Sequence, residues 1–213
     1  MKYPILYSFK RCPYAMRARM SLMLANIKCE LREVRLNNKP NHMLEVSPKG
    51  TVPVLILKDQ VIDESIEIIN WVIDKNKTFE GNLSEDLEEY TENLIELFDK
   101  KFKYHLDRYK YSSRYEGSNE SKHRDECAII LSEIENTISD HDWFFGEKIN
   151  KLDIAILPFI RQFRIANPNW FDQNLESKKV KEYLYRFLES DLLKDVMINY
   201  KVWNEDSELI YFP

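Results

Sequence analysis

The sequence predicts an α+β fold in which a mixed-sheet domain precedes an all-helical domain. Residues 1–75 alternate strand and helix patterns: a strand–helix–strand unit is followed by a hairpin and a further helix. A hairpin after a βαβ unit implies a mixed sheet covered by helices. Residues 76–84 are polar and aperiodic, as in a linker, and residues 85–213 carry mainly helical patterns. We therefore expect a first domain at 1–75, a linker at 76–84 and a helical domain at 85–213.

The elements of the first domain follow from periodicity and from the positions of its prolines. Ile5–Ser8 is a short apolar run typical of a strand. Pro13 is favoured at a first helical position, and apolar residues then recur at helical spacing to Ala25. The other expected elements are a strand at Cys29–Leu36, a short helix at Asn41–Val46, a hairpin of Val54–Leu57 with Gln60–Ile62, and a helix at Ser65–Lys75.

Four main helices are expected in the second domain. The first, Glu85–Tyr111, is acidic in its first part and mainly basic in its last, which complements the helix dipole. In one interpretation this charge pattern only stabilises the helix. In the other, the basic, aromatic end of the helix also lines a substrate groove. The other expected helices are Lys122–Ile138, one that opens at Asn150, and Lys178–Leu188, before an aromatic-rich tail that packs on the body.

The helix at Asn150 is expected to lie at the centre of this domain. Asn150 with Asp153 three positions later resembles a capping box. The run Ile154–Phe163 is apolar almost all round, which is typical of a buried helix. Pro158 either kinks this helix or lies within its first turns.

Composition excludes several classes of function. The chain has 213 residues, 31% of them charged, and a net charge of −5, so we expect no nucleic-acid partner. Its longest apolar stretch is too short to span a bilayer, so we expect no membrane partner. Its four glycines cannot form a G-x-G-x-x-G or Walker loop. Its four histidines lack metal-type spacing, so no metal is expected.

Cysteine usage indicates a reducing compartment. The three cysteines, Cys12, Cys29 and Cys127, are widely spaced and odd in number, which argues against a disulfide framework. Lys2 and Pro4 flank only a short apolar run, so no signal peptide is expected. A cytoplasmic location is the simplest expectation.

Cys12 is the candidate catalytic residue. It precedes Pro13 at the expected N-cap of the first helix, where free N–H groups and the helix dipole favour a thiolate. The thiolate is the reactive form of cysteine. Ala15 stands where a Cys-x-x-Cys pair would have its second cysteine, so disulfide chemistry here needs an outside thiol. The alternative is a buried, inert cysteine.

Three other features of the first domain each have an ordinary structural interpretation. Pro53 directly precedes a strand, and because only about 5% of X–Pro bonds are cis, the residues alone favour trans. Asp63 or Ser65 caps the third helix, or the segment forms an anion site at its N-terminus. Lys39 lies in a loop, where a lysine is normally solvated.

Taken together, these segments resemble the glutathione S-transferase family over the whole chain. The resemblance is to the omega class and its bacterial relatives, and it rests on Cys-Pro-Tyr-Ala at 12–15, Asn-Lys-Pro at 38–40, Gly-Thr-Val-Pro-Val at 50–54, Asp-Glu-Ser at 63–65 and the segment 150–164. It implies a thioredoxin-like domain at 1–75, an all-helical domain at 85–213, and a homodimer. Asn150 departs from the family, which usually has Ser or Thr there.

The resemblance also implies a glutathione site. Pro53 would be cis, and the Val52 backbone would then pair with the cysteinyl part of glutathione. Glu64 and Ser65 would hold the γ-glutamyl end, one at its ammonium and the other at its carboxylate. Lys39 would meet the glycyl carboxylate. Glutathione is thus the expected co-substrate.

Three functional hypotheses follow. In the first, the chain is a thiol transferase or reductase of the dehydroascorbate-reductase type: Cys12 forms a mixed disulfide with glutathione, and a second glutathione resolves it. In the second, the chain is a conjugating transferase in which Tyr7 or Ser8 stabilises the glutathione thiolate. In the third, it is a non-catalytic adaptor in transcription or translation, since fold does not fix function.

An acceptor site is expected in the cleft between the domains, where ligand pockets are common. Its candidate residues are aromatic or basic, and each serves equally well in packing or on the surface. They are Tyr14, Tyr104, Arg108, Tyr111 and Trp170.

Overall fold

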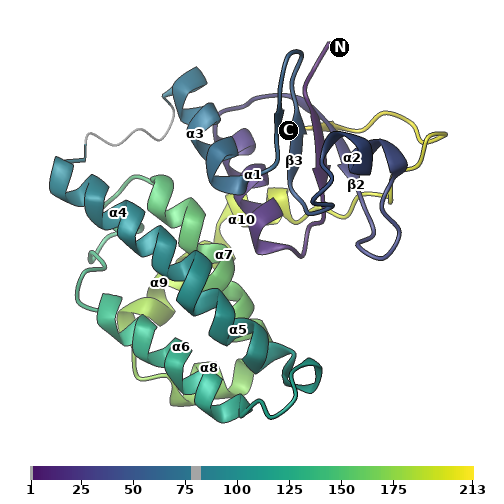
Figure 1. Ribbon diagram of the computed structural model, residues 1–213. Helices are drawn as coiled ribbons and strands as arrows, with labels where there is room; N and C mark the ends of the chain where they lie inside the picture. The colour runs from purple at the N-terminus through teal and green to yellow at the C-terminus, as the bar shows by residue number, and fades with distance from the viewer. Residues whose placement is uncertain (1, 78–82) are drawn as a thin grey trace. The chain divides into compact units, whose positions relative to one another are not determined.

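The computed structural model describes residues 2–77 and 83–213, and these fall into two compact units (Figure 1). The first, here called the N-terminal unit, combines the residues up to 77 with Ser190–Pro213. The second, the helical unit, holds the described residues from 83 to Glu189. Together they give the predicted α+β architecture, with a thioredoxin-like sheet domain and a helical domain.

The N-terminal unit has the predicted βαβ–ββα order. Its elements are β1 (Ile5–Ser8), α1 (Pro13–Leu24), β2 (Cys29–Glu33), α2 (Asn41–Val46), β3 (Val54–Ile56), β4 (Val61–Ile62), α3 (Ser65–Asn76), α10 (Asp191–Val196) and β5 (Tyr211–Phe212). The strands form one sheet in the order β4-β3-β1-β2-β5, where only β1 and β2 run parallel. Helices α3 and α10 both pack against α1.

The second strand is shorter than its sequence pattern suggests. Residues to Leu36 were expected in it, but β2 ends at Glu33, opposite Ser8 at the end of β1. Val34 N–H still donates to Ser8 O at 2.9 Å, and beyond it β1 offers no further partner. A turn closed by Asn38 N–H on Arg35 O follows, and Leu36 is left exposed.

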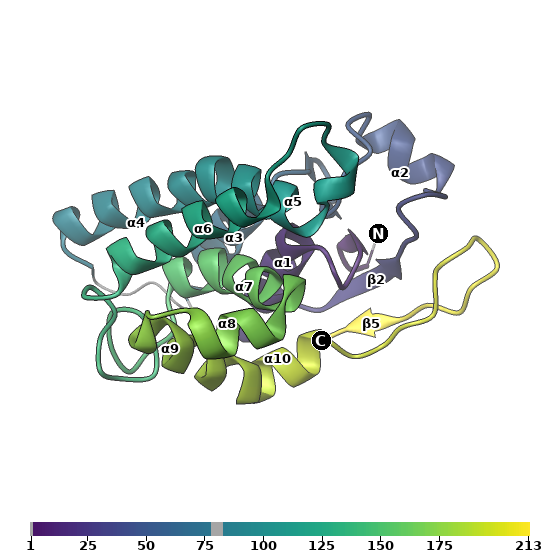
Figure 2. The same cartoon turned by 90° about the horizontal axis from the view of Figure 1, so that it is seen from below.

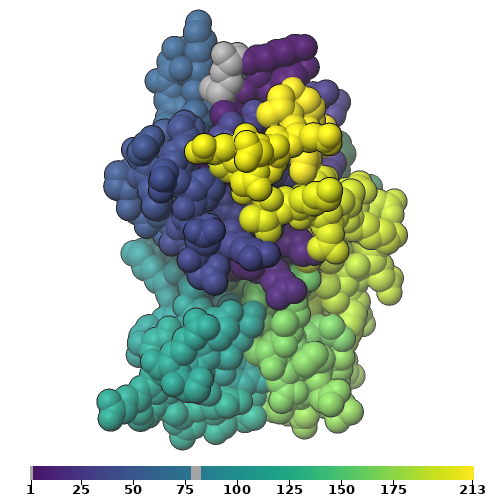
Figure 3. All heavy atoms as spheres, turned by 90° about the vertical axis from the view of Figure 1, so that its right-hand side faces the viewer, coloured from purple at the N-terminus to yellow at the C-terminus, as the bar shows by residue number. Residues whose placement is uncertain are grey.

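The C-terminal tail corrects the expected domain boundary. Residues 85–213 were expected in one helical domain, but Ser190–Pro213 packs with the N-terminal unit. Strand β5 pairs antiparallel with β2, and the two arrows lie next to each other in Figure 2. Phe212 of β5 is buried. In Figure 3 the yellow tail lies against the purple and blue atoms of the first residues of the chain. The tail therefore covers an edge of the sheet that would otherwise be unpaired.

The helical unit contains the four predicted helices and one extra short one. Its elements are α4 (Glu85–Leu97), a π-helical turn (Phe98–Phe102), α5 (Lys103–Lys110), a 3₁₀ turn (Ser112–Arg114), α6 (Glu120–Ile134), α7 (Lys151–Ala166), α8 (Pro168–Asn174) and α9 (Lys178–Glu189). The expected helix Glu85–Tyr111 is thus helical as far as Lys110, with a change of pitch at the π turn. That turn places the buried rings of Phe98 and Phe102 in a stack with centroids 4.5 Å apart.

The expected linker falls largely outside the described residues. Of residues 76–84, positions 78–82 are not described, Asn76 is the last residue of α3, and Ser84 is the N-cap of α4.

The predicted capping box of α7 is confirmed. Asn150 Oδ1 accepts from Leu152 N–H at 2.8 Å, and Asp153 Oδ2 accepts from Asn150 N–H at 2.8 Å. The other Asp153 oxygen accepts from Phe144 N–H at 2.8 Å and from the Tyr183 hydroxyl at 2.7 Å. Burial raises the pKa of Asp153 to about 6 against the opposing effect of these donors. Pro158 lies inside the helix, which continues past it to Ala166.

Replacing Asp153 with alanine should strongly destabilise the helical unit. Three buried donors lose their acceptor at once, and each buried, unpaired donor costs about 1–3 kcal/mol. We expect Asp153→Ala to lower the free energy of unfolding by about 4 kcal/mol in urea titrations. The matched variant Tyr183→Phe removes a single hydroxyl, and we expect it to cost about 1 kcal/mol. Equal losses in the two variants would contradict the proposed role of the carboxylate.

Candidate functional site

Cys12 lies at the N-cap of α1, as the sequence predicted. Its N–H donates to Phe9 O at 2.9 Å, and its carbonyl accepts from Met16 N–H at 2.9 Å, so a tight turn leads directly into the helix. Pro13 occupies the first helical position. Cys12 is partly buried, whereas Cys29 and Cys127 are fully buried. Cys12 is therefore the least buried of the three cysteines.

The thiol of Cys12 faces the segment before β3. Its Sγ lies 3.7 Å from Val52 O, in the geometry of a weak S–H donor, and it does not cap the first turn of α1. The Val52–Pro53 bond is cis, as the family resemblance implied, so the trans expectation from the residues alone was wrong. Both residues are buried.

The start of α3 differs from the expected cap. Its N-cap is Glu64, and no side chain makes a capping hydrogen bond, so neither Asp63 nor Ser65 caps it. Ser65 is buried, and its Oγ accepts from Arg17 Nη1 at 3.2 Å. Arg17, on α1, is fully buried and thus links the start of α3 to the helix that carries Cys12.

Lys49 joins the two acidic residues at this helix start. Its Nζ lies 3.0 Å from Asp63 Oδ1 and 2.6 Å from Glu64 Oε1, and these contacts raise the pKa of Lys49. The Ser47 hydroxyl donates to Asp63 Oδ2 at 2.8 Å and, with Lys49, holds the pKa of Asp63 below its usual range. The Glu64 side chain stays 59% exposed, so its carboxylate remains open to a further cation.

Lys39 approaches the loop that carries Val52. A Cβ atom placed on Gly50 would lie 3.6 Å from Lys39 Nζ and 3.2 Å from Leu44 Cδ2, so the lysine runs along this glycine. Gly50 also has φ +62°, a conformation that side chains disfavour. A glycine here thus allows both the turn and the close packing of the Leu44 side chain.

The structure therefore brings the predicted glutathione-site residues together in one unit. Cys12 contacts Val52, Lys39 approaches Gly50 of the same loop, and Ser65 is joined to α1 through Arg17. Sequence reasoning assigned no site role to Lys49, and it counted Arg17 only as one of the positive charges near Cys12. The one available signal was a pair of arginines, at 17 and 19, inside an otherwise apolar helix.

Tyr7 and Ser8 are both committed to internal hydrogen bonds. The buried Ser8 hydroxyl accepts from Arg19 Nε at 2.8 Å. The Tyr7 hydroxyl accepts from Arg32 Nη1 at 2.7 Å and is bonded to His42 Nδ1 at 2.9 Å, and burial raises the pKa of Tyr7. These two residues therefore have structural roles in this conformation.

The five acceptor-site candidates fall into separate clusters. Tyr14 lies under the guanidinium of Arg17 in the N-terminal unit, 5.3 Å from ring centre to cation. In the helical unit, Arg108 is stacked on Tyr104 at 3.5 Å, and Arg114 is stacked on Tyr111 at 4.3 Å.

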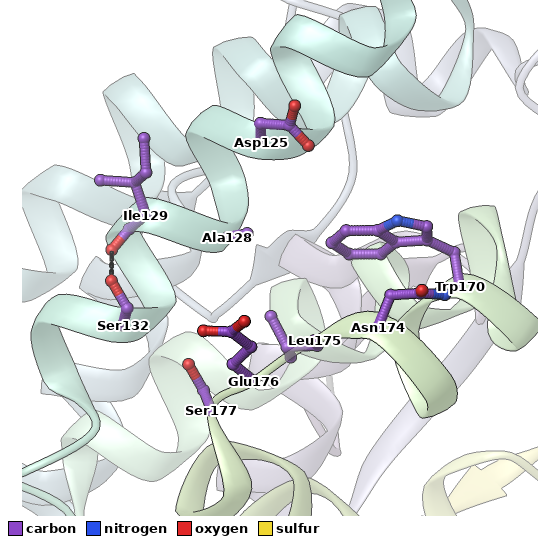
Figure 4. Close-up of a pocket in the computed structure, with 9 residues that line it drawn as sticks. All are labelled: Asp125, Ala128, Ile129, Ser132, Trp170, Asn174, Leu175, Glu176 and Ser177. Carbon is purple, nitrogen blue, oxygen red and sulfur yellow. Dashed lines mark hydrogen bonds between the residues drawn. The ribbon is translucent and has the colours of Figure 1, made fainter.

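Trp170 lines a hollow of about 290 Å³ in the helical unit (Figure 4). Its indole lies across this hollow from α6, and the Glu176 carboxylate points into it. The remaining lining residues are Asp125, Ala128, Ile129, Ser132, Asn174, Leu175 and Ser177. None of the other four acceptor candidates lines this hollow.

A histidine pair joins α5 to α6. His105 Nδ1 and His123 Nδ1 are 2.8 Å apart, so one ring donates to the other, and Tyr104 makes T-shaped ring contacts with both. Burial is the main cause of a lowered pKa for both histidines, and the cations Lys101, Arg108 and Lys122 act in the same direction against Glu126.

In the part of the chain that the structure describes, no cluster of three or more His, Cys, Asp or Glu side chains is arranged to hold a metal ion. The same residues contain no helix long and apolar enough to cross a membrane.

Comparison with known proteins identifies the family. Residues 6–79 match the family described as "Glutathione S-transferase, N-terminal domain". The probable glutathione S-transferase parA of Nicotiana tabacum is 28% identical over 162 residues, or 75% of this chain and 72% of that protein. Protein IN2-1 homolog B of Oryza sativa subsp. indica is 30% identical over 194 residues, or 86% of this chain and 74% of that protein. This chain belongs to the glutathione S-transferase family.

Solved structures of other glutathione transferases share the fold of the chain. The tau-class enzyme from mango, Mangifera indica, has a TM-score of 0.79 at 24% identity, covering 92% of this chain and 93% of its own. A family member from Pseudomonas fluorescens, described with two glutathione molecules bound, has a TM-score of 0.77 at 19% identity and covers 92% of each chain. This transferase therefore shares their fold, with a thioredoxin-like part and a helical part.

The histidine pair should make the helical unit of this transferase sensitive to acid. Because both pKa values lie below the ordinary value of about 6.5, the unfolded chain binds more protons than the folded one just below that pH. Stability should therefore be complete above about pH 6.5 and fall as the pH decreases through the folded pKa values. We expect His123→Gln to reduce the difference in Tm between pH 7 and pH 5.

The exposed His141 provides the control for this measurement. His141→Gln should leave the pH dependence of Tm as in the original chain. If both variants had the same pH dependence as the original chain, the pair would not be the acid-sensitive element.

Proposed function

We propose that this chain is a glutathione-dependent thiol transferase or reductase of the omega-like, dehydroascorbate-reductase type, with Cys12 as its nucleophile. The observation that carries the proposal is the accessible thiol at the N-cap of α1, 3.7 Å from Val52 O, in a glutathione transferase fold. A helix N-terminus favours the thiolate form, which is the nucleophile in disulfide exchange.

The proposed glutathione site uses the contacts of the N-terminal unit. The Val52 backbone, held by cis Pro53, would pair with the cysteinyl part of glutathione beside the Cys12 sulfur. Ser65 would bind the γ-glutamyl carboxylate at the start of α3, where no side chain caps the helix. Glu64, whose carboxylate is 59% exposed, would bind the ammonium group.

Lys39 completes the proposed site at the glycyl carboxylate. Its Nζ already lies near Gly50, two residues from Val52, so the side chain is placed beside the loop that would hold the tripeptide. The relative from Pseudomonas fluorescens is described with glutathione bound, which supports glutathione as the ligand.

The proposed reaction is a two-step thiol–disulfide exchange. The Cys12 thiolate attacks the glutathione sulfur of a mixed disulfide between glutathione and an acceptor thiol. A Cys12–glutathione disulfide forms, and the acceptor leaves as a thiolate that takes a proton. A second glutathione, as thiolate, then attacks the glutathione sulfur, releasing glutathione disulfide and the Cys12 thiolate. Over the two steps the thiol of the second glutathione is oxidised to the disulfide level and the acceptor sulfur is reduced to a thiol, while the sulfur of the first glutathione stays at the disulfide level.

The chain offers no suitable resolving thiol of its own. Position 15 is a fully buried alanine. Burial raises the pKa of Cys29 to about 12 and also raises the pKa of Cys127, so both remain neutral thiols. We therefore propose that a second glutathione reduces the Cys12–glutathione disulfide.

The alternative functions have less support from the structure. Conjugation through Tyr7 or Ser8 needs a hydroxyl directed at the glutathione sulfur, but both hydroxyls are bonded to Arg32, His42 or Arg19. A non-catalytic adaptor needs no reactive thiol, so the test of Cys12 reactivity below distinguishes an adaptor from an enzyme. A homodimer in the cytoplasm remains our proposal from the family resemblance.

Replacing Cys12 should abolish the proposed activity. We expect Cys12→Ser to lose reduction of a glutathione mixed disulfide of a small thiol, measured through glutathione disulfide release in a coupled assay. The control Cys127→Ala removes a fully buried thiol of the helical unit and should retain activity. Full activity in Cys12→Ser would exclude the thiol-transferase assignment, and unreactive Cys12 in the original chain would favour the adaptor.

A further inference from the structure

The turn that carries Cys12 is held by a side chain from β2. The turn runs from Phe9 to Cys12 and is closed by Cys12 N–H on Phe9 O. Inside it, Lys10 N–H donates to Glu33 Oε1 at 2.9 Å. The Glu33 side chain is only 8% exposed, so this bond is shielded from competing water.

Glu33 is itself fixed by a buried cation. Its second oxygen accepts from Arg19 Nη2, on the helix that follows Cys12. Arg19 is fully buried, and its Nε donates to Ser8 Oγ at 2.8 Å. The bonds therefore join the strand before the turn, the turn itself and the helix after it. Such a connected buried network restricts all three segments together.

The C-terminal tail completes the surroundings of this ion pair. Arg19 Nη1 donates to Val196 O at 3.0 Å, and the ring of Tyr200 lies 5.8 Å from the guanidinium. Trp203 N–H donates to Glu33 O at 2.8 Å. The tail thus forms hydrogen bonds to both Arg19 and Glu33 and covers this ion pair, which holds the Cys12 turn.

We propose that Glu33 is a positioning residue for Cys12: together with Arg19 it fixes the turn that places the reactive sulfur at the N-terminus of α1. The proposal rests on the proposed function, because it takes Cys12 as the reactive thiol. It deepens that function by assigning a role to a residue with no described bond to the sulfur. The helix dipole acts mainly within the first turn, so a small displacement of the sulfur changes the stabilisation of its thiolate.

The test compares two glutamates of the same strand. Glu33→Gln removes the charge that pairs with Arg19 and leaves a single acceptor oxygen, so its amide donor must face either the Arg19 guanidinium or the Lys10 N–H. The control Glu30→Gln alters a glutamate that is bonded instead to Arg32, at 2.6 Å. The readouts are the rate of Cys12 alkylation by iodoacetamide as a function of pH, and kcat and KM for glutathione in mixed-disulfide reduction. Alkylation reports on Cys12 even if the chain proves not to be a thiol transferase.

We expect Glu33→Gln to alkylate about tenfold more slowly at pH 7 and to need a higher pH for half-maximal rate, as a displaced catalytic group does. Its kcat should fall while KM for glutathione stays within about twofold, because Glu33 does not line the proposed tripeptide site. Glu30→Gln should match the original chain in every readout.

An alkylation profile of Glu33→Gln identical to that of the original chain would overturn the proposal, even if the variant were less stable. If Glu33→Gln does not fold, Glu33→Asp replaces it, because it keeps the charge that pairs with Arg19 but shortens the side chain that reaches Lys10 N–H. Glu33→Asp should then slow alkylation about threefold with the same shift in pH profile. An unchanged profile in that variant would overturn the proposal equally.

Discussion

Arg19 is a fully buried cation whose guanidinium bonds to three parts of the N-terminal unit: Ser8 of β1, Glu33 of β2 and Val196 at the end of α10. Burying an ion pair costs solvation free energy, and an apolar replacement is often as stable. The net stability gained from the pair is therefore small. The Arg19–Glu33 pair instead restricts the conformation of the segments that it joins. A buried charge is stable only in the conformation in which its hydrogen-bonding partners are present. The sheet, the Cys12 turn and the C-terminal tail are therefore all held in place by the hydrogen bonds of Arg19 and Glu33.

The same constraint explains why the tail belongs to the N-terminal unit. Val196 O accepts from Arg19, and Phe212 is buried where β5 pairs with β2. The tail therefore shields the sheet edge and the ion pair together. Through Trp203, whose ring centre lies 6.0 Å from that of Tyr7, it also packs on the apolar cluster that contains Val52. The C-terminal tail, which is distant from Cys12 in sequence, thus packs both on the ion pair that holds the Cys12 turn and on the cluster that contains Val52.

Local features were predictable from the sequence, and long-range ones were not. The order of β1 to α3, the N-cap position of Cys12 and the capping box of α7 depend on periodicity or on residues within a few positions. The Arg19–Val196 bond joins residues 177 positions apart, and β5 is too short to show a strand pattern. The cis bond at Pro53 was implied only by family resemblance, since local preference favours trans. A buried arginine pair in an apolar helix was the one visible sign of the network.

The site that results has one accessible sulfur, a backbone carbonyl beside it, and charged side chains suited to the ends of a tripeptide. The monothiol chemistry that we propose for it rests on Ala15, which stands where a Cys-x-x-Cys pair would have its second cysteine. The most direct measurement is intact-protein and peptide mass spectrometry after incubation with glutathione disulfide. The account predicts one added glutathionyl group, located on the peptide with Cys12 and removed by excess glutathione. No adduct, an adduct on Cys29 or Cys127, or an internal disulfide would contradict it.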